Sequence, residues 1–340
     1  MDGPALEIAG LGVRYGATVA LADVDLRVGA GEVVALVGPS GCGKSSLLRA
    51  VAGLVPAAGD VRAAGRALHD LPAHRRAVGV VFQDHALFPH LDVAGNVAFG
   101  LVEARAAPAA RRERTHAWLQ RVGLADRAGD DVDRLSGGER QRIALARTLA
   151  PQPPLVLLDE PFASLDPGLR TRLSLEVASW LRELGTAALF VTHDLDEALA
   201  IADRIAVLRA GRLVQVAAPH ELMACPTDPW TARFVGHENV WEGADAARLP
   251  GAPGAALLLA ERARWLPGPD AEVGGTPATC VAASPIRDGW RLELDVPAWG
   301  ARVVWNARPR ELPGGDAPGA GTAGILAAPD EAWLHWEGRG

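Results

Sequence analysis

A nine-residue segment near the start of the chain restricts the fold more than any other feature of the sequence. Lys44 lies within it and is the only lysine among 34 Lys and Arg residues. An ammonium is a compact point charge, whereas a guanidinium is planar and bulky. A lysine kept here alone therefore predicts a site that needs the ammonium itself, reaching between phosphate groups. The segment fits the pattern G-x-x-x-x-G-K-[ST] and consists of Gly38, Pro39, Ser40, Gly41, Cys42, Gly43, Lys44, Ser45 and Ser46.

The residues on either side of this segment predict a strand, a loop and a helix. Residues 32–37 form a short apolar run bounded by glycine, which is typical of a buried strand. Residues 45–52 have a helical pattern that ends at Gly53 and Pro56. The glycines let backbone N–H groups face an anion, and the start of the helix adds a partial positive charge. The Ser45 hydroxyl is then placed to bind Mg²⁺.

Two carboxylates follow a second apolar run, residues 155–158. Asp159 at the end of this predicted strand would hold Mg²⁺, directly or through water. Glu160 comes next and should point the other way, because side chains alternate along a strand. It would polarise a water beside the terminal phosphate as a general base. An acidic surface turn is the alternative, and the phosphate loop in the same chain makes it less favoured.

Residues Leu135 to Glu139 form a third motif, which we call the signature segment. Ser136 is expected to cap a helix, with Glu139 three residues later completing a capping box. The next helix is clear from Ile143 to Leu149. Gly137 and Gly138 leave backbone N–H groups open at the start of a helix, which indicates a second phosphate site in the same chain.

Composition divides the chain near residue 240, with a boundary expected at 236–245. Before it, apolar strands alternate with helical patterns, which predicts an α/β fold with a largely parallel sheet. Seven of the ten Trp residues lie from Trp241 onward, in a stretch rich in Pro and Gly. Short alternating runs at 290–296 and 301–305 predict a small β-barrel or sandwich there. We therefore expect one domain over residues 5–236 and an all-β domain over 240–338.

The remaining bulk properties exclude several classes of function. A formal charge of −7 argues against general affinity for nucleic acid. No apolar run is long enough to cross a bilayer, and the first four residues lack the pattern of a signal peptide. The three cysteines (Cys42, Cys225 and Cys280) are far apart, without the spacing of metal ligands. They indicate a reduced, cytosolic setting.

Taken in order, the motifs resemble those of the ATP-binding subunit of an ABC transporter. The match covers roughly residues 5–236 and also includes Gln83, the run from Ser164 to Asp166, and His193. The resemblance implies a P-loop NTPase fold, with the ABC ATPase domain carrying a helical subdomain. It also implies hydrolysis of ATP with Mg²⁺ as cofactor.

The resemblance further implies a role for each matching residue. Tyr15 would stack on adenine, and the loop from Gly38 to Ser46 would bind the phosphates. Ser45, Gln83 and Asp159 would hold the metal, while Glu160, His193 and Gln83 would act on the attacking water and the terminal phosphate. Ser136, Gly137 and Gly138 would contact the ATP of a second copy in a homodimer, with Asp166 at that interface. For Tyr15 the alternative is simple packing, and for His193 a cap on the following helix.

The second domain resembles the accessory β-domain (TOBE-like) that follows the ATPases of importers for metals, oxyanions, polyamines and thiamine. Residues 257–266 resemble, weakly, that domain's first strand and turn. The resemblance implies a peripheral subunit on the cytoplasmic side of the membrane, bound to permease subunits and acting indirectly with a solute-binding protein. Residues 83–90 would receive a short permease helix, or else form a satellite core cluster.

The transported solute is not set by these residues, because it contacts the permease and the binding protein. Residues 86–91 and the short terminal domain most resemble the ferric-iron importers of this group, which implies ferric iron, with thiamine, polyamines and oxyanions left open. A soluble ATPase acting on DNA or ribosomes is less favoured, because the chain has one ATPase half, no sustained heptads and an acidic charge. An exporter subunit is less favoured because of the terminal β-domain.

Overall fold

The computed structural model describes residues 3–84, 86–249, 255–260, 263–267, 275–312 and 315–336. The chain divides into two compact units, Met1–Pro219 and His220–Gly340. The expected order, an α/β region followed by an all-β sheet region, is confirmed. The division lies before the 236–245 region that composition indicates. The reason is that α8 (Pro229–Phe234) contacts β11 (Val240–Glu242) and β12 (Ala255–Leu258), so this helix belongs to the second unit.

A six-stranded sheet forms the centre of the first unit, in the order β10-β9-β3-β8-β7-β6. All neighbouring pairs are parallel except β9 and β10. Every residue of β3, β7 and β8 is buried, because the sheet is covered on both faces. The strands are β3 (Val33–Val37), β6 (Val78–Val81), β7 (Leu155–Asp159), β8 (Ala187–Val191), β9 (Arg204–Arg209) and β10 (Arg212–Ala217).

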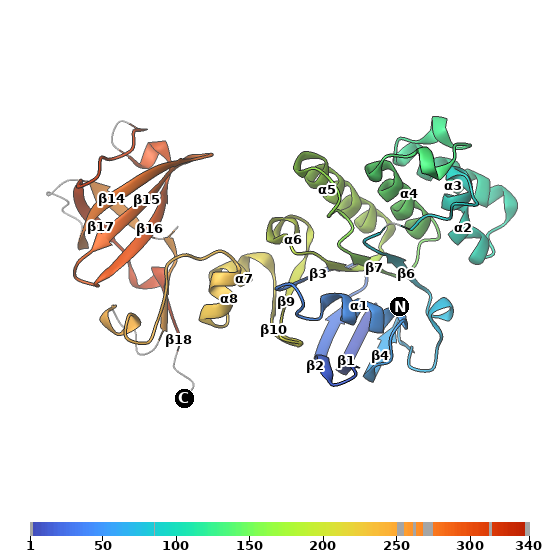
Figure 1. The fold of residues 1–340 in the computed structure, drawn as a ribbon, viewed down its shortest axis with the longest axis horizontal. Coiled ribbons are helices and arrows are strands. Elements are labelled where there is room, and N and C mark those ends of the chain that lie inside the picture. Colours follow the sequence, from blue (N-terminus) through green and yellow to red (C-terminus); the bar gives the residue numbers. More distant parts are fainter. Residues whose placement is uncertain are drawn as a thin grey trace. The chain divides into compact units, whose positions relative to one another are not determined.

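A second, antiparallel sheet lies beside it in the order β2-β1-β4-β5. Helix α1 (Lys44–Ala52) contributes Leu47 and Val51 to an apolar core that also takes in residues of both sheets. Figure 1 shows α1 against the face of the antiparallel sheet. The loop before α1 is therefore fixed by packing on two sides. These strands are β1 (Leu6–Tyr15), β2 (Thr18–Val28), β4 (Ala58–Ala63) and β5 (Arg66–Ala67).

Three helices, α2 (Val93–Glu103), α3 (Pro108–Arg121) and α4 (Gly137–Leu149), contact one another and form the helical subdomain (Figure 1). Helices α5 (Pro167–Leu184) and α6 (Leu195–Ile201) follow β7 and β8 respectively. Trp118 of α3 meets Trp180 of α5 edge to face at 5.7 Å. Short 3₁₀ turns lie at Ala73–Arg75, Ala125–Arg127 and Val132–Arg134.

Two antiparallel sheets make up most of the second unit, in the orders β11-β12-β18 and β13-β17-β14-β15-β16. The strands expected at 290–296 and 301–305 are confirmed as β15 (Gly289–Val296) and β16 (Ala301–Ala307). The others are β13 (Arg264–Pro267), β14 (Thr276–Ile286), β17 (Ala323–Ala327) and β18 (Trp333–Trp336). Helix α7 (Pro219–Ala224) and 3₁₀ turns at Ala246–Arg248, Pro309–Glu311 and Asp330–Ala332 complete it.

Several tryptophans of this unit belong to its apolar core or pack against it. Trp299 and Trp305 are buried, and Trp241 and Trp333 pack against the same apolar core. The ring centroids of Trp299 and Trp333 lie 5.2 Å apart. Within the segment 257–266, Glu261 and Arg262 lie outside the described residues. The Trp-rich composition therefore serves packing.

Candidate active site

The phosphate loop connects β3 to α1 and leaves the start of that helix uncapped. Gly43 is the residue before the helix, with φ of 112° and no side chain capping the first turn. A Cβ built at Gly43 would lie 2.6 Å from the carbonyl oxygen of Ala20 on β2. Only glycine fits here, because both the left-handed backbone and the close approach of β2 exclude a side chain. The first N–H groups of α1 are thus open to an anion.

Lys44 is only 7% exposed and folds back across its own loop. Its Nζ donates to the carbonyl oxygens of Gly38 at 2.7 Å and Pro39 at 3.0 Å. The Cys42 Sγ lies 3.9 Å from the same nitrogen. Burial raises the pKa of the Cys42 thiol, although Lys44 opposes this. Cys42 is therefore a small, protonated residue of the loop and no reactive thiolate.

Ser45 and Asp159 meet between the loop and the end of β7. The Ser45 hydroxyl donates to Asp159 Oδ1 at 3.2 Å. Burial raises the pKa of Asp159, against the hydrogen bond from Ser45; the Glu160 charge adds to the rise. A hydroxyl and a desolvated carboxylate are oxygen donors that suit Mg²⁺, and a cation would offset the cost of burying the charge. The residues present therefore fit a magnesium ion.

Glu160 lies one residue beyond β7, in a left-handed conformation with φ of 46°. Its backbone N–H donates to Val191 at the end of β8. The strand has already ended at Asp159, so the direction of the Glu160 side chain is set by the left-handed backbone turn. The alternation of side chains along a strand, which the sequence led us to expect, does not set it. Nonglycine residues at positive φ are strained, and such strain is concentrated at functional sites.

Two side chains converge on one oxygen of this carboxylate. Glu160 Oε2 lies 3.2 Å from His193 Nδ1 and 3.4 Å from Gln83 Nε2. His193 follows β8 but does not cap the next helix. That cap is Asp194, which accepts from the backbone N–H groups of Asp196 and Glu197. The structure thus brings together three residues that lie far apart in the sequence, at the carboxyl edge of the parallel sheet.

The signature segment begins α4 with the expected capping box. The Ser136 hydroxyl accepts from the Glu139 N–H at 3.4 Å, and Glu139 Oε2 accepts from the Ser136 N–H at 2.8 Å. Hydrogen bonds from Ser136 and then Arg127 hold the pKa of Glu139 below its usual range. A Cβ at Gly137 would meet none of the described residues within 4 Å. The start of α4 therefore faces open space at this glycine.

The other predicted residues lie at exposed positions. Tyr15 ends β1 and is 46% exposed, so it is not a packing residue. Asp166 caps α5, its Oδ1 accepting from the Leu169 N–H at 3.0 Å. Within the part of the chain that the structure describes, no hydrogen bond or ion pair joins Ser136 or Asp166 to Glu160, Lys44 or Asp159.

The segment from Gln83 to His90 is anchored at Phe88; His85 lies outside the described residues. The Phe88 ring lies 4.4 Å from the Phe99 ring, and the Arg147 guanidinium carbon lies 4.8 Å from the Phe88 ring centroid. Buried Asn96 binds both backbone groups of Phe88. Sequence reasoning missed Asn96 and Arg147, although each is a polar residue in an otherwise apolar stretch of its helix.

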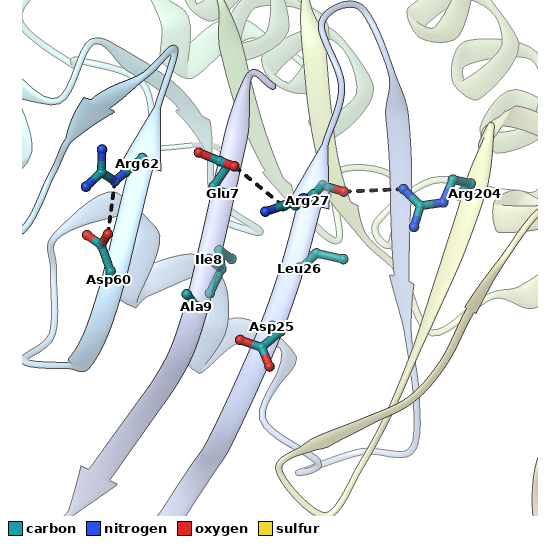
Figure 2. A pocket seen from close by; sticks show the side chains of 9 residues that line it. All are labelled: Glu7, Ile8, Ala9, Asp25, Leu26, Arg27, Asp60, Arg62 and Arg204. Carbon is teal, nitrogen blue, oxygen red and sulfur yellow. Dashed lines mark hydrogen bonds and ion pairs between the residues drawn. The ribbon is translucent and has the colours of Figure 1, made fainter. Parts of the chain in front are cut away.

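A hollow of about 590 Å³ lies away from this site, on the antiparallel sheet. Figure 2 shows acidic and basic side chains lying side by side along it, with Arg204 beside Arg27. Arg27 pairs with Glu7 at 3.4 Å and Arg62 with Asp60 at 2.9 Å. These exposed charges compensate one another, so the hollow is a solvated sheet face, and the chemistry lies at the phosphate loop.

A family model and the similar proteins of known function all point to one protein family. Residues 21–163 match the model of the ABC transporter family. The chain is 50% identical to the Fe(3+) ions import ATP-binding protein FbpC of Streptomyces coelicolor, over 73% of this chain and 72% of that protein. It is 44% identical to the putrescine transport ATP-binding protein PotG of Escherichia coli, over 71% and 64%. Against the sulfate/thiosulfate import ATP-binding protein CysA 2 of Chromobacterium violaceum it is 41% identical, over 91% and 85%.

No helix among the described residues has the length and apolar character needed to cross a bilayer. The phosphate loop, the two carboxylates after β7 and the signature segment all lie within residues 21–163, which match the family model. The chain belongs to the ABC transporter family, as an importer-type ATP-binding subunit that couples ATP hydrolysis to transport.

Proposed function

We propose that this chain hydrolyses ATP with Glu160 as the general base, and that two copies drive one importer. The observation that carries the proposal is the convergence of His193 and Gln83 on Glu160 Oε2, next to the Ser45–Asp159 pair. A carboxylate held by two neighbours at a phosphate loop is placed to take a proton from water as it attacks the terminal phosphate.

Each neighbour of Glu160 has a separate part in this reaction. His193 lies on the same oxygen as Gln83, so both side chains fix the direction of the carboxylate before a water arrives. His193, which is half exposed, also has its second ring nitrogen for the terminal phosphate. The strained backbone at Glu160 keeps the base directed, so that little reorganisation is needed during proton transfer.

Lys44 has to change partners when nucleotide binds. Its Nζ is bound to the carbonyls of Gly38 and Pro39, where it supports the loop. Phosphate oxygens carry full charge and are better acceptors than carbonyls. We infer that the ammonium turns to the phosphates, while loop amides from Gly38 to Ser46 surround them and Tyr15 stacks on adenine.

Ser45 and Asp159 would hold Mg²⁺, with Gln83 as a third oxygen donor. When bound, the ion neutralises charge on the phosphate oxygens. The Ser45–Asp159 hydrogen bond already places two of these oxygens side by side. Gln83 can serve both groups because its amide nitrogen is the atom directed at Glu160, which leaves its oxygen for the metal.

The second phosphate site at α4 supports a homodimer. The loop of each chain already binds one set of phosphates, so Ser136, Gly137 and Gly138 would contact the ATP of the other copy. Asp166 would lie at the same interface. We propose the ATP-binding domain over residues 5–236 and the accessory domain over 240–338. The subunit would act peripherally on the cytoplasmic face of the membrane, against permease subunits and indirectly with a solute-binding protein.

For the solute, we propose ferric iron. Four relatives named for Fe(3+) import are 47–52% identical to this chain, whereas those named for polyamines or sulfate are 40–44% identical. Uptake of radioactive iron by vesicles containing the chain with its permease tests this choice. Uptake of putrescine or sulfate instead, without iron, would replace it.

Replacing Glu160 with glutamine tests the reaction. The amide keeps the shape but cannot accept the proton, so kcat should fall about 10²–10⁴-fold while ATP still binds. Turnover is measured by phosphate release and binding by equilibrium dialysis. A variant that keeps half of its turnover would remove Glu160 from the role of base.

A further inference from the structure

Arg147, in the middle of α4, carries a half-buried guanidinium. Arg147 Nη1 is buried and has no hydrogen-bond acceptor in the described part of the chain. Burial lowers the pKa of the guanidinium, and the nearby Asp84 charge opposes this. No ion pair within 4.0 Å links Arg147 to any described carboxylate. Burying one guanidinium nitrogen without an acceptor carries a free-energy cost, so the contacts that hold this side chain in place are informative.

The attractive contact that Arg147 does make is with the Phe88 ring. Its guanidinium carbon lies 4.8 Å from the ring centroid, a cation–π arrangement. Phe88 itself is fixed from the other sides by the Phe99 ring and by Asn96, which is fully buried. Helices α2 and α4 approach closely at this level, because a Cβ on Gly100 would lie 2.9 Å from the Arg147 carbonyl oxygen. Arg147 thus fixes Phe88 against two helices of the subdomain.

Phe88 closes a short segment whose other end holds the reacting carboxylate. Gln83 lies five residues before it and contacts Glu160 at 3.4 Å. Asp84, next to Gln83, is exposed and attracts the Arg147 charge. Among the described residues, both attractions of Arg147 therefore act on the segment that carries Gln83: one on the ring at its far end, the other on the residue beside Gln83.

We infer that Arg147 is a positioning residue for the ATPase reaction, acting through Phe88 to set where Gln83 meets Glu160. This inference rests on the proposed role of Gln83.

An epistasis experiment on the full-length chain tests this assignment. Arg147→Met keeps the volume and removes the charge. It should lower kcat for ATP about tenfold. A cation–π contact away from water stabilises by an energy that corresponds to about this factor in rate. KM for ATP should change less than about twofold, because the phosphate loop is untouched. In a Gln83→Ala background, the same substitution should cause no further loss of kcat.

Matched variants separate positioning from general damage. Arg121→Met removes a similar cation–π contact, in which the guanidinium carbon lies 5.1 Å from the Trp118 ring centroid, and should leave kcat unchanged. Arg147→Lys should recover part of the loss, because an ammonium still attracts the ring. If Arg147→Met does not fold, Phe88→Leu reports on the same coupling and should also be masked by Gln83→Ala.

The outcomes are distinguishable. An equal fold-loss from Arg147→Met in both backgrounds would overturn the inference and leave the role of Gln83 intact. A Gln83→Ala variant with wild-type kcat would remove Gln83 from the proposed reaction, and the inference with it. Loss of thermal stability with unchanged kcat would show that Arg147 is only a structural residue.

Discussion

The starts of α1 and α4 both carry glycine, yet their first turns are finished in opposite ways. At α1 the residue before the helix is Gly43, with no side-chain cap and no acidic residue in the first turn. At α4, Ser136 and Glu139 close the first turn with their own side chains, and Arg127 pairs with Glu139 at 2.8 Å. The start of α1 is therefore open to a ligand. At the start of α4, the Glu139 carboxylate already places a negative charge beside the first turn.

The pKa values of the two carboxylates beside these helices, Asp159 and Glu139, are shifted in opposite directions. Burial raises the pKa of Asp159, so the charged form is strained until a cation arrives. Hydrogen bonds from Ser136 lower the pKa of Glu139, so its charged form is stable in the free protein. The comparison teaches that one helix start is prepared for a ligand at a cost in stability, and the other is stable without one.

A large loss of turnover should come from Lys44→Arg. The charge is kept, but the guanidinium is too large for the carbonyl pocket of the loop. We expect kcat/KM for ATP to fall by about 10²-fold or more, measured by phosphate release. Arg66→Lys on an exposed strand is the control and should have no effect. Near wild-type turnover in Lys44→Arg would show that the open helix start needs only positive charge.

A heterodimer test asks whether the α4 start acts on the other subunit. Lys44→Ala in one copy and Ser136→Arg in the other damage one shared site and leave the second intact. The same two changes in a single copy damage both sites. The first arrangement keeps one intact site and the second keeps none, so the first should bind more ATP, measured on tagged, separated dimers. More binding in the second arrangement would mean that Ser136 acts within its own chain, and equal binding would mean that it is only a helix cap.

Asp159→Asn should raise the Tm of the nucleotide-free protein by about 2–4 °C, while abolishing Mg²⁺-dependent hydrolysis. The folded-state pKa of Asp159 is raised, so its ionised form destabilises the fold at neutral pH. This penalty disappears as pH falls through the folded and then the unfolded pKa. The gain in Tm should accordingly shrink toward pH 4 in calorimetry. A lower Tm at neutral pH would contradict the assigned cost of burial.

Glu139→Gln should have the smallest effect, a loss of about 0.5–1 kcal/mol in the free energy of unfolding. The folded-state pKa is lowered, so the stabilisation is present above the unfolded pKa and is lost as pH falls through the folded one. Urea unfolding at several pH values measures it. Wild type and variant should converge in acid; a constant difference at all pH values would assign the effect to shape and not to charge.

The sequence predicted the elements at the site well, because each motif carries its own local cause. Gly53 ends α1 as expected, and the capping box at Ser136 forms as its spacing requires. The contacts of Glu160 could be grouped only through the resemblance, since Gln83 and His193 are 77 and 33 residues from it. The left-handed backbone of Glu160 could not be predicted from the sequence, because glutamate has no preference for positive φ.

The division between the two compact units does not coincide with the change in composition. Composition changes at Trp241, but α8 precedes that change and packs on strands that follow it. The sequence of a helix does not show which sheet the helix will pack against. Arg147 was missed in the same way: a lone arginine on a helix is ordinary, and only the position of Phe88 makes it unusual.

The solitary Lys44 has a consequence for chemical labelling. It is the only side-chain amine in the chain, and it is buried and held by two carbonyls. General acylating reagents that modify surface lysines will find no side-chain target on the exterior. An ATP analogue with an acylating phosphate would instead carry its reagent to this one nitrogen. A single covalent adduct would then count occupied sites directly, even in a crude membrane extract.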